Sequence, residues 1–142
     1  MRRISLVSLL FVVLLSCSDD SSTSGLYGTW RLSERGSSPG SGYNVEPVPA
    51  VPAQFLILSG DGTVQSNIKF FDLDHTHYYE LSEDPQDGSK IITFYPSRGS
   101  HNEDRDGRSF AIEQTSTTLR LYFRYCIEGC HLGFVTNDVD PH

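Results

Sequence analysis

The sequence predicts an all-β domain, an antiparallel meander of about eight strands that closes into a barrel or a closely related sandwich. After its N-terminal segment, the chain of 142 residues consists of short apolar or alternating runs separated by glycine, proline, asparagine and aspartate. This is the pattern of an all-β fold, and no run has the apolar spacing of an amphipathic helix. Most runs are joined by hairpin-length links, and closure into a barrel removes exposed strand edges.

The first half of the domain carries three predicted strands. Trp30 and Leu32 alternate with polar neighbours and mark the first strand. The stretch 36–52 is rich in glycine, serine and proline, so it is predicted to be a long loop. Residues 55–58 form a continuous apolar run, and a Gly-Asp-Gly turn joins them to a strand at 63–66, which indicates a hairpin.

The second half carries five predicted strands, each marked by period-two alternation or by an apolar run. The residues that share one face of their strand are His77, Tyr79 and Leu81, then Phe110 and Ile112, then Leu119, Leu121, Phe123 and Tyr125, then Leu132 and Phe134. Residues 91–95 are predicted to pair with the first of these strands across a turn at 84–89. Arg120, Tyr122 and Arg124 are expected on the opposite face of their strand.

The N-terminal segment has the layout of a lipoprotein signal peptide. Arg2 and Arg3 precede an apolar run at 4–15, which is too short to cross a bilayer that needs ~20 residues. The four residues that end at Cys17 resemble a lipobox, in which the cysteine after a small residue is acylated and cleavage occurs just before it. Each buried methylene contributes roughly 0.8 kcal/mol, so two or three acyl chains on this cysteine anchor a protein firmly. The alternative is an ordinary signal peptide with a chance cysteine.

The predicted organisation is a lipoprotein signal peptide at 1–16, a lipidated flexible tether at 17–25 and one barrel domain at 26–142. The tether is polar and too poor in apolar residues to fold. The Ser-Asp-Asp sequence directly after the cysteine resembles the surface-export signal of Bacteroidetes lipoproteins, and a plain solvated linker is the alternative. We therefore expect an outer-membrane lipoprotein, periplasmic or surface-exposed, attached to the membrane through its lipid.

Charge and cysteine content narrow the function classes. The net charge is −7, and cleavage before Cys17 would remove two arginines and no acidic residue, so it would become −9. Such a surface argues against nucleic acid or anionic lipid headgroups as partners. Cys126 and Cys130 form a pair in an exported, oxidising setting, so a disulfide is expected. A zinc site would need a second ligand pair, and a redox pair would have CxxC spacing.

These features together resemble the small lipocalin-like lipoproteins of Bacteroidetes. Residues 26–32, Leu-Tyr-Gly-Thr-Trp-Arg-Leu, look like the opening Gly-x-Trp strand of lipocalins, with Gly28 and Trp30 as the structural motif residues. The Cys-x-x-x-Cys hairpin before the last strand also fits. The resemblance implies that Trp30 lies at the closed end of the barrel, where Arg120 or Arg124 packs over it by a cation–π contact. The Thr-Asp-Tyr loop motif of secreted lipocalins is absent, which leaves open a cup or a filled interior.

One short pattern matches the oxygen-ligand spacing of a calcium loop. Asn102, Asp104 and Asp106 alternate before a glycine, and Glu113 follows six residues after that glycine. The flanking segments are predicted to be strands, whereas a true EF-hand loop lies between helices. A solvated turn rich in aspartate and asparagine needs no ion and is the preferred interpretation.

A second pattern is the pair His75 and His77, which would share a strand face and there chelate a metal. No third ligand is identifiable, so a polar strand entrance is the preferred interpretation. The sequence has no nucleophile elbow, phosphate-binding glycine loop or catalytic triad pattern. A pair of carboxylates for glycoside hydrolysis stays open, because acidic residues can converge in three dimensions. We predict a protein without cofactor or metal and without catalytic activity.

Two functions follow as hypotheses. The first is a membrane-anchored, non-catalytic domain that binds a small apolar or amphipathic ligand in its barrel. The second is a structural or interaction lipoprotein with a filled barrel, which contacts another envelope protein through the loops at 36–52 and 96–108. The volume of the cavity separates them, because a ligand pocket is expected to be on the order of 300 Å³ or more.

Overall fold

The computed structural model of the chain describes residues 25–40, 42–99 and 108–137. Within them the chain forms nine antiparallel strands in one sheet and one short 3₁₀ helix. The strands are β1 (Gly28–Ser37), β2 (Asn44–Pro47), β3 (Phe55–Leu58), β4 (Val64–Ser66), β5 (Tyr78–Glu83), β6 (Lys90–Tyr95), β7 (Arg108–Gln114), β8 (Thr118–Phe123) and β9 (Cys130–Thr136). None of the helical structure described is long and apolar enough to cross a membrane.

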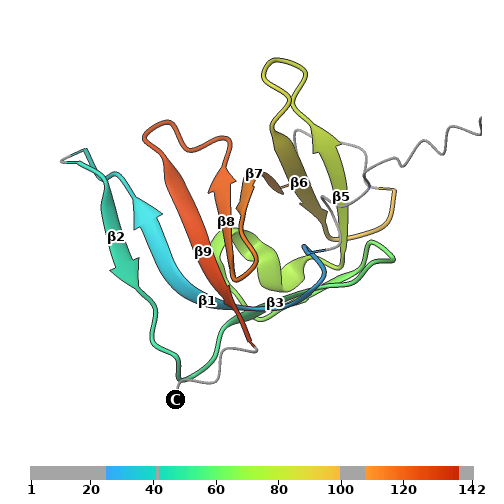
Figure 1. Ribbon diagram of the computed structural model, residues 1–142, viewed down its shortest axis with the longest axis horizontal. Coiled ribbons are helices and arrows are strands. Elements are labelled where there is room, and N and C mark those ends of the chain that lie inside the picture. The colour runs from blue at the N-terminus through green and yellow to red at the C-terminus, as the bar shows by residue number, and fades with distance from the viewer. Residues whose placement is uncertain (1–24, 41, 100–107, 138–142) are drawn as a thin grey trace, which may run out of the picture.

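Eight of these strands form a nearly closed barrel. Their order is β4-β3-β1-β9-β8-β7-β6-β5, so each strand lies beside its neighbour in sequence once β2 is set aside, and β1 pairs with β9. β4 and β5 meet only at the bridge between Thr63 and Tyr78, which leaves a seam between them. The all-β antiparallel barrel predicted from the sequence is confirmed (Figure 1).

The interior of the barrel is filled by apolar side chains. Phe94, Phe110 and Phe134 are fully buried, and the rings of Phe94 and Phe110 meet edge to face with centroids 5.7 Å apart. The predicted alternation holds, because Leu119 and Leu121 of β8 are fully buried while their neighbours are exposed or half-buried. Each such side chain stabilises the fold by roughly 1.5–3 kcal/mol relative to exposure. The barrel is therefore a packed core in its middle.

A short 3₁₀ helix, η1 (Phe70–His75), closes one end of the barrel between β4 and β5. Its Leu73 is fully buried. Its Phe71 packs against Phe110 and Phe123, with ring centroids 5.5 and 4.6 Å away. Figure 1 shows the η1 coil within the curve of the sheet.

The prediction that His75 and His77 share a strand face is wrong. His75 is the last residue of η1, and β5 begins only at Tyr78. The 3₁₀ turn is favoured because it buries Leu73 in the barrel core. The alternating polar residues around Leu73 did not indicate this burial. His75 instead lies beside Asp74, with Nδ1 3.0 Å from Oδ1, and its side chain is largely exposed.

The stretch 36–52 was predicted to be entirely loop, and this too is wrong. β1 continues to Ser37 and pairs there with β2, in register from Glu34↔Pro47 to Ser37↔Asn44. All four residues of β2 are exposed. Backbone pairing without a buried face leaves no apolar alternation in the sequence, so propensity alone could not reveal this strand.

The links between strands differ in construction. η1 joins β4 to β5, and the link between β8 and β9 carries the predicted disulfide of Cys126 and Cys130. Figure 1 shows the β5–β6 hairpin standing clear of the neighbouring strands. Its Asp84 forms an ion pair with Arg124, which follows the end of β8.

Candidate functional site

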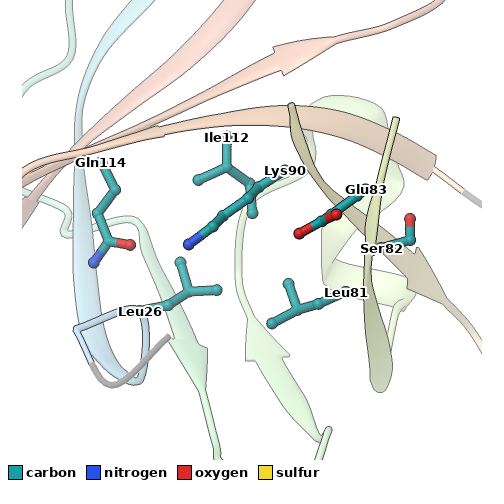
Figure 2. A pocket seen from close by; sticks show the side chains of 7 residues that line it. All are labelled: Leu26, Leu81, Ser82, Glu83, Lys90, Ile112 and Gln114. Carbon is teal, nitrogen blue, oxygen red and sulfur yellow. The ribbon is translucent and has the colours of Figure 1, made fainter. Parts of the chain in front are cut away.

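A pocket of about 210 Å³ opens at the end of the barrel that bears the β5–β6 hairpin, and we call it the mouth pocket. Its apolar wall is formed by Leu26, Leu81 and Ile112, and its polar rim by Glu83, Lys90 and Gln114. Figure 2 shows these side chains converging from β5, β6, β7 and the segment before β1. The combination of aliphatic wall and charged rim suits a small amphipathic molecule.

Period-two alternation explains how β5 and β6 build this pocket. Leu81 and Glu83 lie two residues apart on β5 and so point to the same side of the strand. Glu83 is the register partner of Lys90 on β6, which places opposite charges side by side at the rim. Leu81 is 37 % exposed, so the wall of the pocket is open to solvent.

The segment before β1 forms the remaining wall, and Trp30 fixes it. The indole N–H of Trp30 donates a 2.8 Å hydrogen bond to the carbonyl of Leu26, and both residues are buried. An added Cβ at Gly25 would lie 3.0 Å from Nε2 of Gln114. The chain therefore enters the domain beside the mouth pocket.

One implication of the lipocalin resemblance is corrected by this geometry. Trp30 is buried and bonded to Leu26, which lines the mouth pocket, and its place at a closed end of the barrel stays a prediction. Neither predicted arginine packs over it. Arg120, on the outer face of β8, has its Nε 2.9 Å from Glu34 Oε1. Arg124, just past the end of β8, has its Nη2 2.5 Å from Asp84 Oδ2. Among the described residues, the arginine–ring contacts are made elsewhere.

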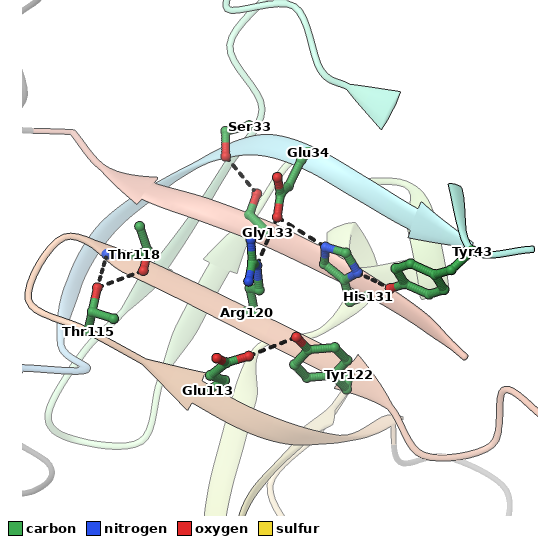
Figure 3. A network of polar contacts seen from close by, with 10 residues as sticks. All are labelled: Ser33, Glu34, Tyr43, Glu113, Thr115, Thr118, Arg120, Tyr122, His131 and Gly133. Carbon is green, nitrogen blue, oxygen red and sulfur yellow. Dashed lines mark hydrogen bonds and ion pairs between the residues drawn. The ribbon is translucent and has the colours of Figure 1, made fainter. Parts of the chain in front are cut away.

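The outer face of the barrel carries a second constellation, the outer polar cluster of Glu34, Tyr43, Arg120 and His131. His131 is 4 % exposed, and its Nδ1 hydrogen-bonds to the Tyr43 hydroxyl while its Nε2 lies 3.1 Å from Glu34 Oε1. Arg120 Nε donates to the same Glu34 oxygen. Figure 3 shows how β1, β8, β9 and the β1–β2 hairpin each bring one member of the cluster together.

Two glycines make room for this cluster. A Cβ at Gly133 of β9 would lie 2.7 Å from Oε1 of Glu34, closer than real Cβ contacts come. A Cβ at Gly36 of β1 would overlap the imidazole of His131. The cluster therefore requires glycine at positions 36 and 133 as well as its four polar side chains, and these residues come from several strands.

The cluster holds its charges by mutual contact. Burial alone would raise the pKa of Glu34, but hydrogen bonds from His131 and Arg120 hold that pKa below its ordinary value. Burial and the charge of Glu34 raise the pKa of Tyr43. A tyrosine held in its neutral form is a poor nucleophile, and neither of the pockets described here is lined by a member of the cluster. The geometry suits the joining of strands more than catalysis.

A further pocket, of about 340 Å³, lies at the seam between β4 and β5, and we call it the seam pocket. Its lining includes Asp61 of the β3–β4 turn, Tyr78 and Glu80 of β5, and Arg98. No sequence pattern predicted this pocket, because it depends on the incomplete pairing of β4 with β5. Alternation predicts that two strands follow one another but not how far they pair.

The predicted metal sites have different outcomes. Asn102, Asp104 and Asp106 lie outside the described residues, so the choice between the preferred solvated turn and the calcium loop is not tested. Its last member, Glu113, lies on β7 and accepts a 2.7 Å hydrogen bond from the Tyr122 hydroxyl. No cluster of three or more histidine, cysteine or acidic residues suited to a metal occurs in the part of the chain that the structure describes.

The predicted lipidation residue, Cys17, also lies outside the described residues. The motif glycine, Gly28, has a φ of 137°, a conformation that side chains with a Cβ rarely adopt. No protein-family model, curated protein or solved structure matches this chain. The function must therefore be inferred from the chain's own residues and geometry.

Proposed function

We propose that this chain is an exported lipoprotein, anchored to the outer membrane through Cys17, whose barrel holds a small amphipathic ligand at its mouth without catalysing a reaction. The mouth pocket carries this proposal, because it joins an aliphatic wall to a rim with both charges. At about 210 Å³ it is below the ~300 Å³ expected of a barrel that encloses its ligand, so a fully enclosed ligand is disfavoured. The proposal is therefore that the pocket takes one apolar end of a ligand, with the polar end at the rim.

The position of the mouth supports a ligand that comes from the membrane. Gly25, the first described residue, lies beside Gln114 at the rim. Gly25 is eight steps along the chain from Cys17, and an extended chain spans at most roughly 3.6 Å per residue. An anchored Cys17 thus keeps the mouth within about 30 Å of the bilayer surface.

A second function, contact with another envelope protein, is favoured by a separate observation. The barrel middle is filled, and Ile127 in the disulfide loop is 100 % exposed. Tyr125 and Tyr43 are also exposed. Exposed apolar groups on loops are frequent contact points for partners.

Native mass spectrometry separates the two functions. A chain that begins at Gly25, exported by a bacterial host, is expected to carry a reproducible mass excess that disappears on unfolding. Leu81→Asp places a charge in the mouth pocket and should abolish the excess. Val45→Asp, an equally exposed site on β2, should retain it. A bare wild-type mass, or an excess that persists in Leu81→Asp, would favour the interaction function over mouth binding.

The anchor has its own test. Cells that express the full chain are grown with radiolabelled palmitate, and label is expected on the exported protein. Cys17→Ser should lose the label and release the protein from the membrane fraction, because the acyl chains supply the membrane affinity. Label that persists in this variant would show that the lipid is attached to another residue, and would contradict the proposed anchor at Cys17.

A further inference from the structure

The seam pocket lies where the barrel is least complete. β4 and β5 are joined at Thr63↔Tyr78 by two backbone hydrogen bonds, from the N–H of Val64 to the carbonyl of His77 and from the N–H of Tyr79 to the carbonyl of Gly62. Beyond this point β5 continues to Glu83 past the β3–β4 turn. Among the described residues, no strand pairs with that edge of β5, and the pocket occupies the adjoining outer surface.

The walls of the seam pocket come from three segments. Tyr78 and Tyr95 are direct register partners on β5 and β6 and form an aromatic wall. The guanidinium of Arg98 lies over the ring of Tyr78, with Cζ 5.0 Å from the ring centroid. Glu80 follows two residues after Tyr78 and so lies on the same outer side of β5. Asp61 contributes a second carboxylate from the turn.

The carboxylate of Asp61 is held in place. Its Oδ1 accepts hydrogen bonds from the N–H of Thr63 at 3.0 Å and from the hydroxyl of Thr63 at 2.6 Å. These bonds lower the pKa of Asp61, so it is ionised at neutral pH. Its Oδ2 receives no hydrogen bond from a described residue, and the same holds for the exposed carboxylate of Glu80. Asp61 is therefore an oriented acceptor, and both carboxylates line the pocket next to an aromatic surface.

This combination selects against most ligand classes. Two carboxylates disfavour phosphates and other anions, and Arg98 disfavours a simple cation. The wall lacks the aliphatic side chains of the mouth pocket, so a purely apolar ligand gains little. A neutral molecule with many hydroxyl groups fits, since hydroxyls donate to carboxylates and accept from a guanidinium, while its C–H face packs on a tyrosine ring.

We propose that the seam pocket, between the β3–β4 turn and β5–β6, binds a neutral saccharide through Glu80, Asp61, Arg98 and the ring of Tyr78. Its volume of about 340 Å³ is within the range of small-molecule sites. The site is on the outer side of β5, whereas Leu81 and Glu83 of the same strand serve the mouth pocket. Saccharide binding is therefore independent of the function proposed for the mouth.

The test uses the full chain, exported and lipidated by its host and purified in a detergent without a sugar headgroup. The protein is applied to an array of neutral oligosaccharides built from hexoses, pentoses and N-acetylhexosamines, and the best glycan is titrated by calorimetry. Glu80→Gln and Arg98→Gln are each expected to weaken binding about tenfold, because a hydrogen bond to a charged group is lost. Both side chains are exposed, so the fold should persist.

Glu83→Gln is the matched control, because it changes the same residue type on the same strand but on the side of the mouth pocket. It should change the affinity for the glycan by less than about twofold. The proposal is overturned if no neutral glycan binds the wild-type protein, or if Glu80→Gln and Arg98→Gln bind as tightly as wild type. It is equally overturned if Glu83→Gln weakens binding as much as Glu80→Gln, since the saccharide would then sit at the mouth.

Discussion

On the inner face of the barrel wall, burial and shape decide which residues are present, whereas on the outer face of β1, β8 and β9 individual polar contacts decide. Phe94, Phe110 and Phe134 fill the inside without a single polar partner, as a packed core requires. Outside, Glu34 touches both Arg120 and His131 through one oxygen, and Gly133 must lack a side chain for this to happen. The inner face should tolerate similar apolar residues, while the outer cluster should depend on each member.

The largest expected effect is on the inner face. Phe110→Ala removes a fully buried ring that contacts three other aromatic rings, and should lower the free energy of unfolding by ~3–5 kcal/mol. Leu81→Ala at the open mouth should cost less than ~1.5 kcal/mol, because its side chain is already partly solvated. Urea unfolding of the two variants measures both values. Equal costs would mean that the barrel middle is no better packed than its mouth.

A smaller effect is expected from one methyl group on the outer face. Gly133→Ala places a Cβ against the Glu34 carboxylate, and should cost ~1–3 kcal/mol in thermal or chemical unfolding. The same change in a Glu34→Ala background should be neutral or stabilising, because alanine is otherwise preferred over glycine in a strand. A cost that is the same in both backgrounds would show that the glycine serves the backbone and not the cluster.

The smallest effect concerns the dependence of stability on pH. The folded pKa of Glu34 is below its ordinary value of 4.5. Its ion contacts therefore add stability above that ordinary pKa, and this contribution is lost as the pH falls through the folded pKa. Glu34 is partly solvated, so the contribution should be below ~1 kcal/mol.

Unfolding free energies measured from pH 6 to pH 3 test this. Wild type should lose more stability over that interval than Glu34→Gln, which has no carboxyl to protonate. Asp61 and Asp87 also have lowered pKa values, but they are present in both proteins and cancel in the difference. Parallel curves for the two proteins would show that Glu34 does not contribute to the dependence of stability on pH.

The contrast between the two faces also explains what the sequence could predict. Alternation predicted the barrel and the buried positions of β7, β8 and β9, because burial on one face leaves a period of two. Spacing and compartment predicted the disulfide between Cys126 and Cys130. β2 and η1 were missed, since β2 buries no face and η1 contributes Leu73 through a turn that has no period of two.

The sites were harder to predict than the fold. The members of the outer polar cluster are Glu34, Tyr43, Arg120 and His131, and up to 97 residues separate a contacting pair. No local pattern connects residues at such distances, and only the register of β1, β8 and β9 brings them together. The seam pocket depends on where β5 continues past its bridge to β4, which is a matter of strand register and not of side-chain pattern.

The central claim is that the barrel middle is a filled scaffold and that only its mouth is open to a ligand. Methyl NMR under xenon pressure tests it most directly, because xenon enters any apolar cavity large enough to hold it. Xenon-induced shifts are expected at the methyl groups of Leu26, Leu81 and Ile112 and not at those of Leu32 and Leu121. Shifts of equal size at Leu32 and Leu121 would reveal a cavity inside the barrel, and the interior would then be a ligand cup rather than a filled scaffold.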